Sequence, residues 1–156
     1  DKGLLMSYRT VGDILEFSEG LHRHASALYE RLRDDTQRER VDMMLKLLAD
    51  HEQRLATALE RYRDGNKAAI LSEWHQFEAA DVADIVMDAR ELHMDISVTE
   101  LVQLALKVDD YLISAYQQLA ADASSAEVRA LFEDLANLEQ AEKISAVRAA
   151  LSVDDW

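Results

Sequence analysis

The sequence predicts an all-α protein whose single domain, residues 1–156, contains four long helices. Proline is absent and only four of the 156 residues are glycine, so almost nothing interrupts a helix. Apolar residues also recur at spacings of three and four over long stretches, which is the period of a helix that buries one face. A chain of this length is large enough to form one hydrophobic core of its own.

Four helix starts are indicated by a Ser or Thr that is followed three residues later by an acidic residue, as in a capping box. These pairs are Thr10 and Asp13, Thr36 and Glu39, Ser97 and Glu100, and Ser124 and Glu127. The predicted helices cover about residues 10–34, 36–63, 97–121 and 124–152. Gly65, in the segment Asp64-Gly65-Asn66, is expected to end the second helix in a left-handed turn.

The connections predict how the helices are paired. Short links join the first helix to the second and the third to the fourth, so each pair is expected to form an antiparallel hairpin. A long crossover, residues 67–96, joins the hairpins and contains helical segments, most clearly residues 81–87. Its apolar residues at helical spacing are Ile70, Leu71, Trp74 and Phe77. This stripe is expected either to cap the helices or to join two copies of the chain in a homodimer.

The two predicted hairpins are related by an internal repeat. A shift of 87 residues (97 minus 10) carries Thr10 onto Ser97 and Tyr29 onto Tyr116. The same shift superposes the segment LAxxEQ at residues 48–53 on the segment LAxxEQ at residues 135–140. Helix starts, tyrosines and glutamates that agree under one ungapped shift indicate a duplicated hairpin with approximate twofold symmetry.

Glu52 and Glu139 stand within the apolar faces of the second and fourth predicted helices. Each lies four residues after a leucine of its apolar stripe, so both side chains are expected to point inward. A buried carboxylate without a partner is costly, and it is stabilised by a cation, a proton or a metal. His22 and Asp109, which the same shift relates, face them from the first and third helices. Glu142, one turn beyond Glu139, adds a fifth polar side chain.

This arrangement resembles the ferritin-like superfamily, in particular its rubrerythrin-like branch, over the four helices and the crossover. In that family a glutamate on the first and third helices joins a Glu-x-x-His motif on the second and fourth to hold two irons. The matching positions are His22, Glu52, Leu55, Asp109, Glu139 and Glu142. Both motif glutamates are kept, whereas Leu55 and Glu142 replace the motif histidines. His22 and Asp109 replace the other two glutamates.

The resemblance implies a metal site formed by His22, Glu52, Asp109, Glu139 and Glu142. Carboxylate-rich ligation without cysteine suits iron or manganese. The implied function is iron handling or metal-dependent redox chemistry, and whether the protein is an enzyme stays open. In the alternative, the protein keeps the ferritin-like fold as a metal-free, non-catalytic oligomeric structural or interaction module.

The alternative functions imply other roles for the buried polar residues. In a metal-free protein, Glu52 and Glu139 would belong to a core polar network with His22, an arginine or tyrosine hydroxyls. A third alternative is a small-molecule binder that uses the interior. His51, which is adjacent to Glu52, is expected to face solvent or a subunit contact in any of these cases.

Composition excludes several other functions. A net charge of −14 argues against binding to nucleic acid or to an anionic membrane surface. No apolar run is long enough to span a membrane. The absence of cysteine excludes disulfides, a thiolate nucleophile and zinc–thiolate sites. The chain begins at Asp1 rather than at methionine, which indicates trimming, and a cytoplasmic location is expected.

Overall fold

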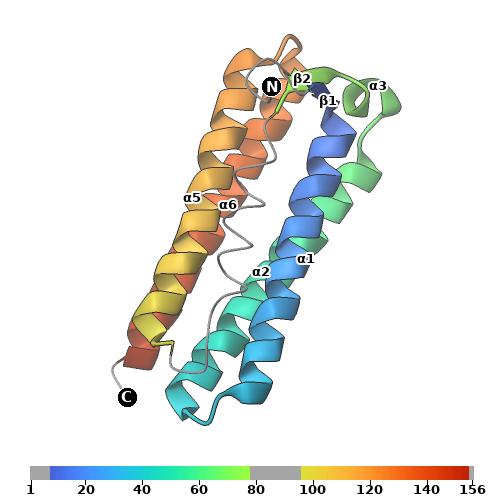
Figure 1. The fold of residues 1–156 in the computed structure, drawn as a ribbon. Coiled ribbons are helices and arrows are strands. Elements are labelled where there is room, and N and C mark those ends of the chain that lie inside the picture. Colours follow the sequence, from blue (N-terminus) through green and yellow to red (C-terminus); the bar gives the residue numbers. More distant parts are fainter. Residues whose placement is uncertain (1–7, 78–95, 155–156) are drawn as a thin grey trace, which may run out of the picture.

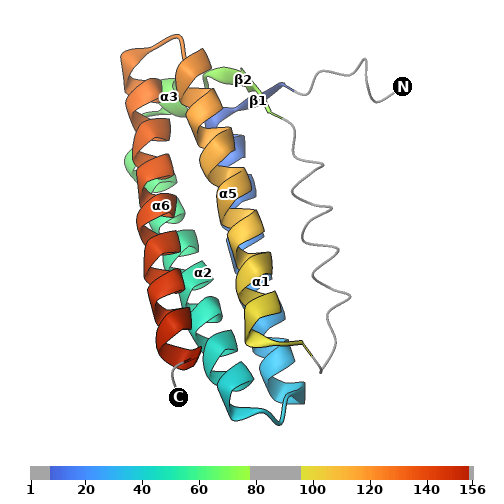
Figure 2. The ribbon, with the colours of Figure 1, turned by 90° about the vertical axis from the view of Figure 1, so that its left-hand side faces the viewer.

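The computed structural model describes residues 8–77 and 96–154 and confirms the all-α prediction. Four long helices run side by side, as Figures 1 and 2 show. They are α1 (Val11–Asp35), α2 (Glu39–Gly65), α5 (Val98–Asp122) and α6 (Ala126–Asp154). Helices α1 and α2 form one hairpin, α5 and α6 form the other, and α2 packs along α6. No helix of the described residues is long and apolar enough to cross a membrane.

The starts of the first helix in each hairpin follow the predicted repeat. The Thr10 hydroxyl accepts a hydrogen bond from the Asp13 backbone N–H at 3.1 Å, and the Ser97 hydroxyl accepts one from the Glu100 N–H at 3.1 Å. Helices α1 and α5 are both 25 residues long. Each side-chain oxygen satisfies a donor that has no partner within the helix, so both capping predictions are confirmed.

The predicted starts of the second helices are wrong by a few residues. Helix α2 begins only at Glu39, because Thr36 ends α1 by donating its backbone N–H to the Leu32 carbonyl at 3.1 Å. Helix α6 begins at Ala126, and Ser125 rather than Ser124 accepts the hydrogen bond from the Val128 N–H, at 3.2 Å. The chain reverses direction over the three-residue links 36–38 and 123–125.

The end of α2 also differs from the prediction. No residue of the described chain, Gly65 included, has a positive φ angle. Helix α2 continues through Gly65, and Asn66 ends it with φ −98° and ψ 151°. The Asn66 side-chain amide donates a hydrogen bond to the Tyr62 carbonyl. Because a side chain satisfies this carbonyl, the left-handed glycine turn is not required.

The crossover is only partly helical where the structure describes it. After the short helix α3 (Ala68–Leu71), strand β2 (Trp74–Gln76) pairs antiparallel with β1 (Tyr8–Thr10). The predicted helical stripe is therefore wrong, because its third residue lies in a strand. Ile70, Leu71 and Phe77 pack on the core, whereas Trp74 is 65% exposed. The helical segment predicted at residues 81–87 lies outside the described residues.

The hydrophobic core consists of two clusters. One cluster, near the two strands, includes Ile14, Leu112 and Phe132. The other, near the link between α1 and α2, includes Leu45 and Leu101. Along α1, α2 and α6, the buried residues His22, His51, Glu52 and Glu139 lie between members of the two clusters, whereas Asp109 on α5 follows Val108 of the first cluster. These five residues form the layer described next.

Candidate functional site

Each long helix contributes at least one buried polar residue to a single layer of the interior. His22 comes from α1, His51 and Glu52 from α2, Asp109 from α5 and Glu139 from α6, and all are at most 1% exposed. We call these five residues the polar layer. Since each helix must turn the same side toward its neighbours to bury its leucines, the polar residues at the same height are brought together.

His22 lies between the two motif glutamates. Its Nδ1 bonds the Glu52 Oε2, and its Nε2 lies 2.7 Å from the Glu139 Oε1. An imidazole that donates through both ring nitrogens to carboxylates is an imidazolium. Burial by itself lowers the pKa of His22, but the charges of Glu139 and Glu52 outweigh it and hold the pKa well above the ordinary value. The prediction that Glu52 and Glu139 both point inward is confirmed.

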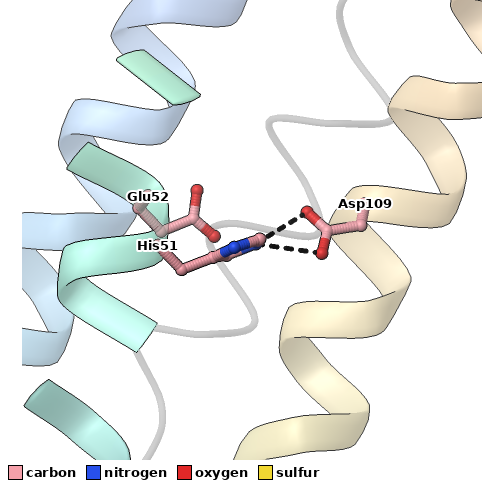
Figure 3. A group of neighbouring side chains, drawn as sticks. All are labelled: His51, Glu52 and Asp109. Atoms are coloured by element: carbon pink, nitrogen blue, oxygen red, sulfur yellow. Dashed lines mark hydrogen bonds and ion pairs between the residues drawn. The ribbon is translucent and has the colours of Figure 1, made fainter. Parts of the chain in front are cut away.

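His51 forms the second contact of the layer. Its Nε2 lies 3.1 Å from the Asp109 Oδ2 (Figure 3). Its Nδ1 lies 3.3 Å from the Glu142 Oε2. Burial lowers the pKa of His51, but the hydrogen bond and charge of Asp109 outweigh it and raise the pKa. Burial raises the pKa of Asp109, and His51 offsets only part of that effect.

The expectation that His51 faces solvent or a subunit contact is wrong, because the residue is 1% exposed within the single chain. The ring points from α2 across the interior to α5, as Figure 3 shows. A signal was present in the sequence, because Met44, Leu48, His51 and Leu55 continue one stripe with spacings of four, three and four. The adjacent Glu52 obscured it, since two neighbouring residues of a helix seldom both point inward.

The predicted metal ligands do not all lie in the same environment. His22, Glu52, Asp109 and Glu139 belong to the polar layer, whereas the Glu142 side chain is 20% exposed and lies at its edge. The Arg54 Nε donates to both Glu142 oxygens, at 3.2 and 3.3 Å. Glu142 therefore joins the buried His51 to the surface.

Leu55 and the two tyrosines complete the surroundings of the layer. Leu55 is fully buried, so the interior contains an apolar side chain where the family's motif has a histidine. Burial, with the charges of Glu52 and Asp109, raises the pKa of Tyr29 well above the ordinary value. Burial and Glu139 do the same for Tyr116. Leu55, Tyr29 and Tyr116 therefore add no positive charge to the layer.

The donor set and its spacing fit a metal ion. One ligand atom each from His51, Glu52 and Asp109 lie within 4.8 Å of one another. Two ligand atoms about 2.2 Å from one ion are up to about 4.4 Å apart, so these three side chains would have to move only slightly closer together to hold an ion. The Glu52 Oε1 and the Glu139 Oε2 are buried and accept no hydrogen bond within the described residues. Two such oxygens are costly without a partner, and a cation would satisfy them.

Comparison with protein-family models, with curated proteins and with solved structures found no match to this chain.

Proposed function

We propose that this chain is a ferritin-like protein of the rubrerythrin-like type that binds a divalent metal, iron or manganese, in the polar layer. The observation that carries the proposal is the pair of buried carboxylate oxygens without hydrogen bonds, the Glu52 Oε1 and the Glu139 Oε2. The cluster of His51, Glu52 and Asp109 adds a nitrogen donor and further oxygen donors. Imidazole and carboxylate together suit iron and manganese better than softer metals.

The residues of the layer would take different parts in binding. Glu52, Asp109 and Glu139 would supply oxygen ligands and His51 a nitrogen ligand. His22 holds two of these carboxylates in place, and it must release a proton before either ring nitrogen can become a ligand. The bound metal would supply one-electron redox chemistry, for storage or for oxidation of a substrate. The two apolar clusters on either side exclude water from the layer.

Metal binding can be tested at equilibrium. Protein purified without chelators is loaded anaerobically with ferrous iron or with Mn²⁺, and bound metal is measured by elemental analysis and by titration calorimetry. Glu139→Ala should weaken binding by at least about tenfold, as loss of a direct ligand does. Glu133→Ala is the matched control, because Glu133 is an exposed glutamate of the same helix. Equal affinities for the two variants would refute the proposed site.

A second function, a metal-free oligomeric module, is favoured by one specific observation. His22 bonds a carboxylate through each ring nitrogen, so the layer already contains a cation between Glu52 and Glu139. Wild-type protein that contains no more iron, manganese or zinc than the Glu52→Ala/Glu139→Ala double variant would favour this function. The double variant is needed because either glutamate alone could retain a metal with Asp109.

A homodimer is compatible with both proposed functions. Of the predicted crossover stripe, only Trp74 offers a large exposed apolar surface, and Tyr8 on the paired strand is 58% exposed. We infer that a homodimer would use these two aromatic side chains. Sedimentation velocity at several protein concentrations should show a dimer that Trp74→Ser weakens. A monomer at every concentration would refute this surface.

A further inference from the structure

A groove between α2 and α6 reaches the edge of the polar layer. It has a volume of about 540 Å³, and Gln53, Arg54 and Thr57 on α2 face Leu138 and Glu142 on α6 across it. Glu142 is part of the groove wall and also bonds His51, so one side chain belongs both to the surface and to the contacts of the layer. Two other grooves of the described surface contain neither Glu142 nor any residue of the layer.

A smaller cavity continues along the same seam. Its volume is about 80 Å³, and it is lined by His51 and Arg54 together with apolar residues that include Met44, Leu48 and Ala146. A water molecule occupies about 30 Å³ in the liquid, so this space is large enough for more than one water molecule beside the His51 ring. The seam between α2 and α6 therefore approaches the layer from the surface at two adjoining places.

The Arg54–Glu142 ion pair closes this seam. The Arg54 Nε and Nη2 both donate to Glu142, at 3.2 to 3.3 Å. The Arg54 side chain is 54% exposed and that of Glu142 is 20% exposed, whereas His51 beneath them is 1% exposed. An ion pair this exposed stabilises its closed arrangement only weakly, so thermal motion opens it often. The guanidinium also places a positive charge where a cation would have to pass.

We propose that the groove between α2 and α6 is the route by which a divalent cation enters the polar layer, and that the Arg54–Glu142 ion pair is its gate. The inference rests on the proposed function. The other directions are less suitable, since apolar clusters fill the interior on both sides of the layer. The net charge of −14 attracts cations to the surface, so passage through the seam rather than encounter would limit their entry.

A gate changes the rates of binding without changing the affinity. Arg54→Gln and Glu142→Gln each remove the ion pair, so each should raise both the association and the dissociation rate by about two- to fivefold. In Arg54→Gln the dissociation constant should stay within about twofold of wild type, because both rates change together. If Glu142 were instead a permanent ligand, Glu142→Gln would weaken the affinity.

The test uses Co²⁺ as the probe and stopped-flow absorbance as the readout. The full chain is mixed with Co²⁺ for association and with excess chelator for dissociation, and the stoichiometry is measured by equilibrium titration. Arg23→Gln and Glu60→Gln are the matched controls. Arg23 and Glu60 form another interhelical ion pair, half-buried, at 3.1 Å between α1 and α2, and neither residue lines the groove. Circular dichroism verifies that every variant is folded.

The possible outcomes distinguish a failure of the gate from a failure of the metal site. Faster exchange in both gate variants, with control variants at the wild-type rates, supports the route. Unchanged rates in Arg54→Gln, or equal changes in Arg54→Gln and Arg23→Gln, refute the gate and leave the metal site standing. A weaker affinity in Glu142→Gln with an unchanged association rate also refutes it. Wild-type protein that binds neither Co²⁺ nor ferrous iron at equilibrium refutes the proposed function, and the gate with it.

Discussion

The free energy of unfolding of the metal-free protein should fall as the pH rises from 7 to 8. His22 is held as an imidazolium by Glu139 and Glu52, and its pKa in the folded state lies well above the ordinary value. A histidine in the unfolded chain loses its proton around pH 6.5. Between pH 7 and 8 the folded state therefore binds more protons than the unfolded state, and the stability that His22 contributes is lost as the pH rises.

The size of the effect follows from the number of protons. Each proton that the folded state binds in excess changes the free energy of unfolding by about 1.4 kcal/mol per pH unit. His22 should thus account for a loss of about 1 kcal/mol between pH 7 and 8, a little less than the full value because the unfolded histidine still binds part of a proton at pH 7. His51, whose pKa is also raised, adds to the loss. The raised pKa of Asp109 acts in the same direction but begins at lower pH.

Urea unfolding followed by far-ultraviolet circular dichroism measures this slope. A chelator must be present, because protons compete with a bound metal and would give the opposite trend. Glu52→Gln should flatten the slope, since it removes one of the two charges that raise the pKa of His22. Glu60→Gln, at a half-exposed glutamate of the same helix outside the layer, should leave the slope unchanged. Stability that is constant or rises from pH 7 to 8, or equal slopes in the two variants, would contradict the reasoning.

Three further predictions concern stability alone. Glu73→Gln should cost about 1 kcal/mol near neutral pH, because Glu73 accepts hydrogen bonds from two serines at the start of α6. Burial raises the pKa of Glu73, but these hydrogen bonds outweigh burial, so the pKa is lowered. The difference in melting temperature between wild type and Glu73→Gln should therefore vanish as the pH falls through the pKa of Glu73. Thr10→Ala should cost about 1 kcal/mol in urea unfolding, whereas Thr36→Ala, at a residue that caps no helix start, should cost less. Leu55→Ala should cost about 2–5 kcal/mol by the same measurement, and a cost below about 1 kcal/mol would mean that the site collapses around the smaller side chain.

The four long helices and most of the polar layer could be predicted from the sequence. Helical periodicity determines the direction of each side chain relative to its neighbours, so Glu52 and Glu139 were placed inward by the leucines around them. The internal repeat then identified Asp109 as the position equivalent to His22, and this step required no knowledge of how the helices pack. Both steps depend only on residues of the same helix or on the comparison of two segments.

Other features depended on contacts between segments that are distant in the sequence. His51 lies inward because Asp109 on α5 and Glu142 on α6 meet its two ring nitrogens. Ser125 rather than Ser124 caps α6, and Glu73 in the crossover accepts a hydrogen bond from each of the two serine hydroxyls. Periodicity indicates which face of a helix is buried. Which residue at the edge of that face turns inward depends on residues of other helices, because a buried polar group is stable only where it has a hydrogen-bond partner.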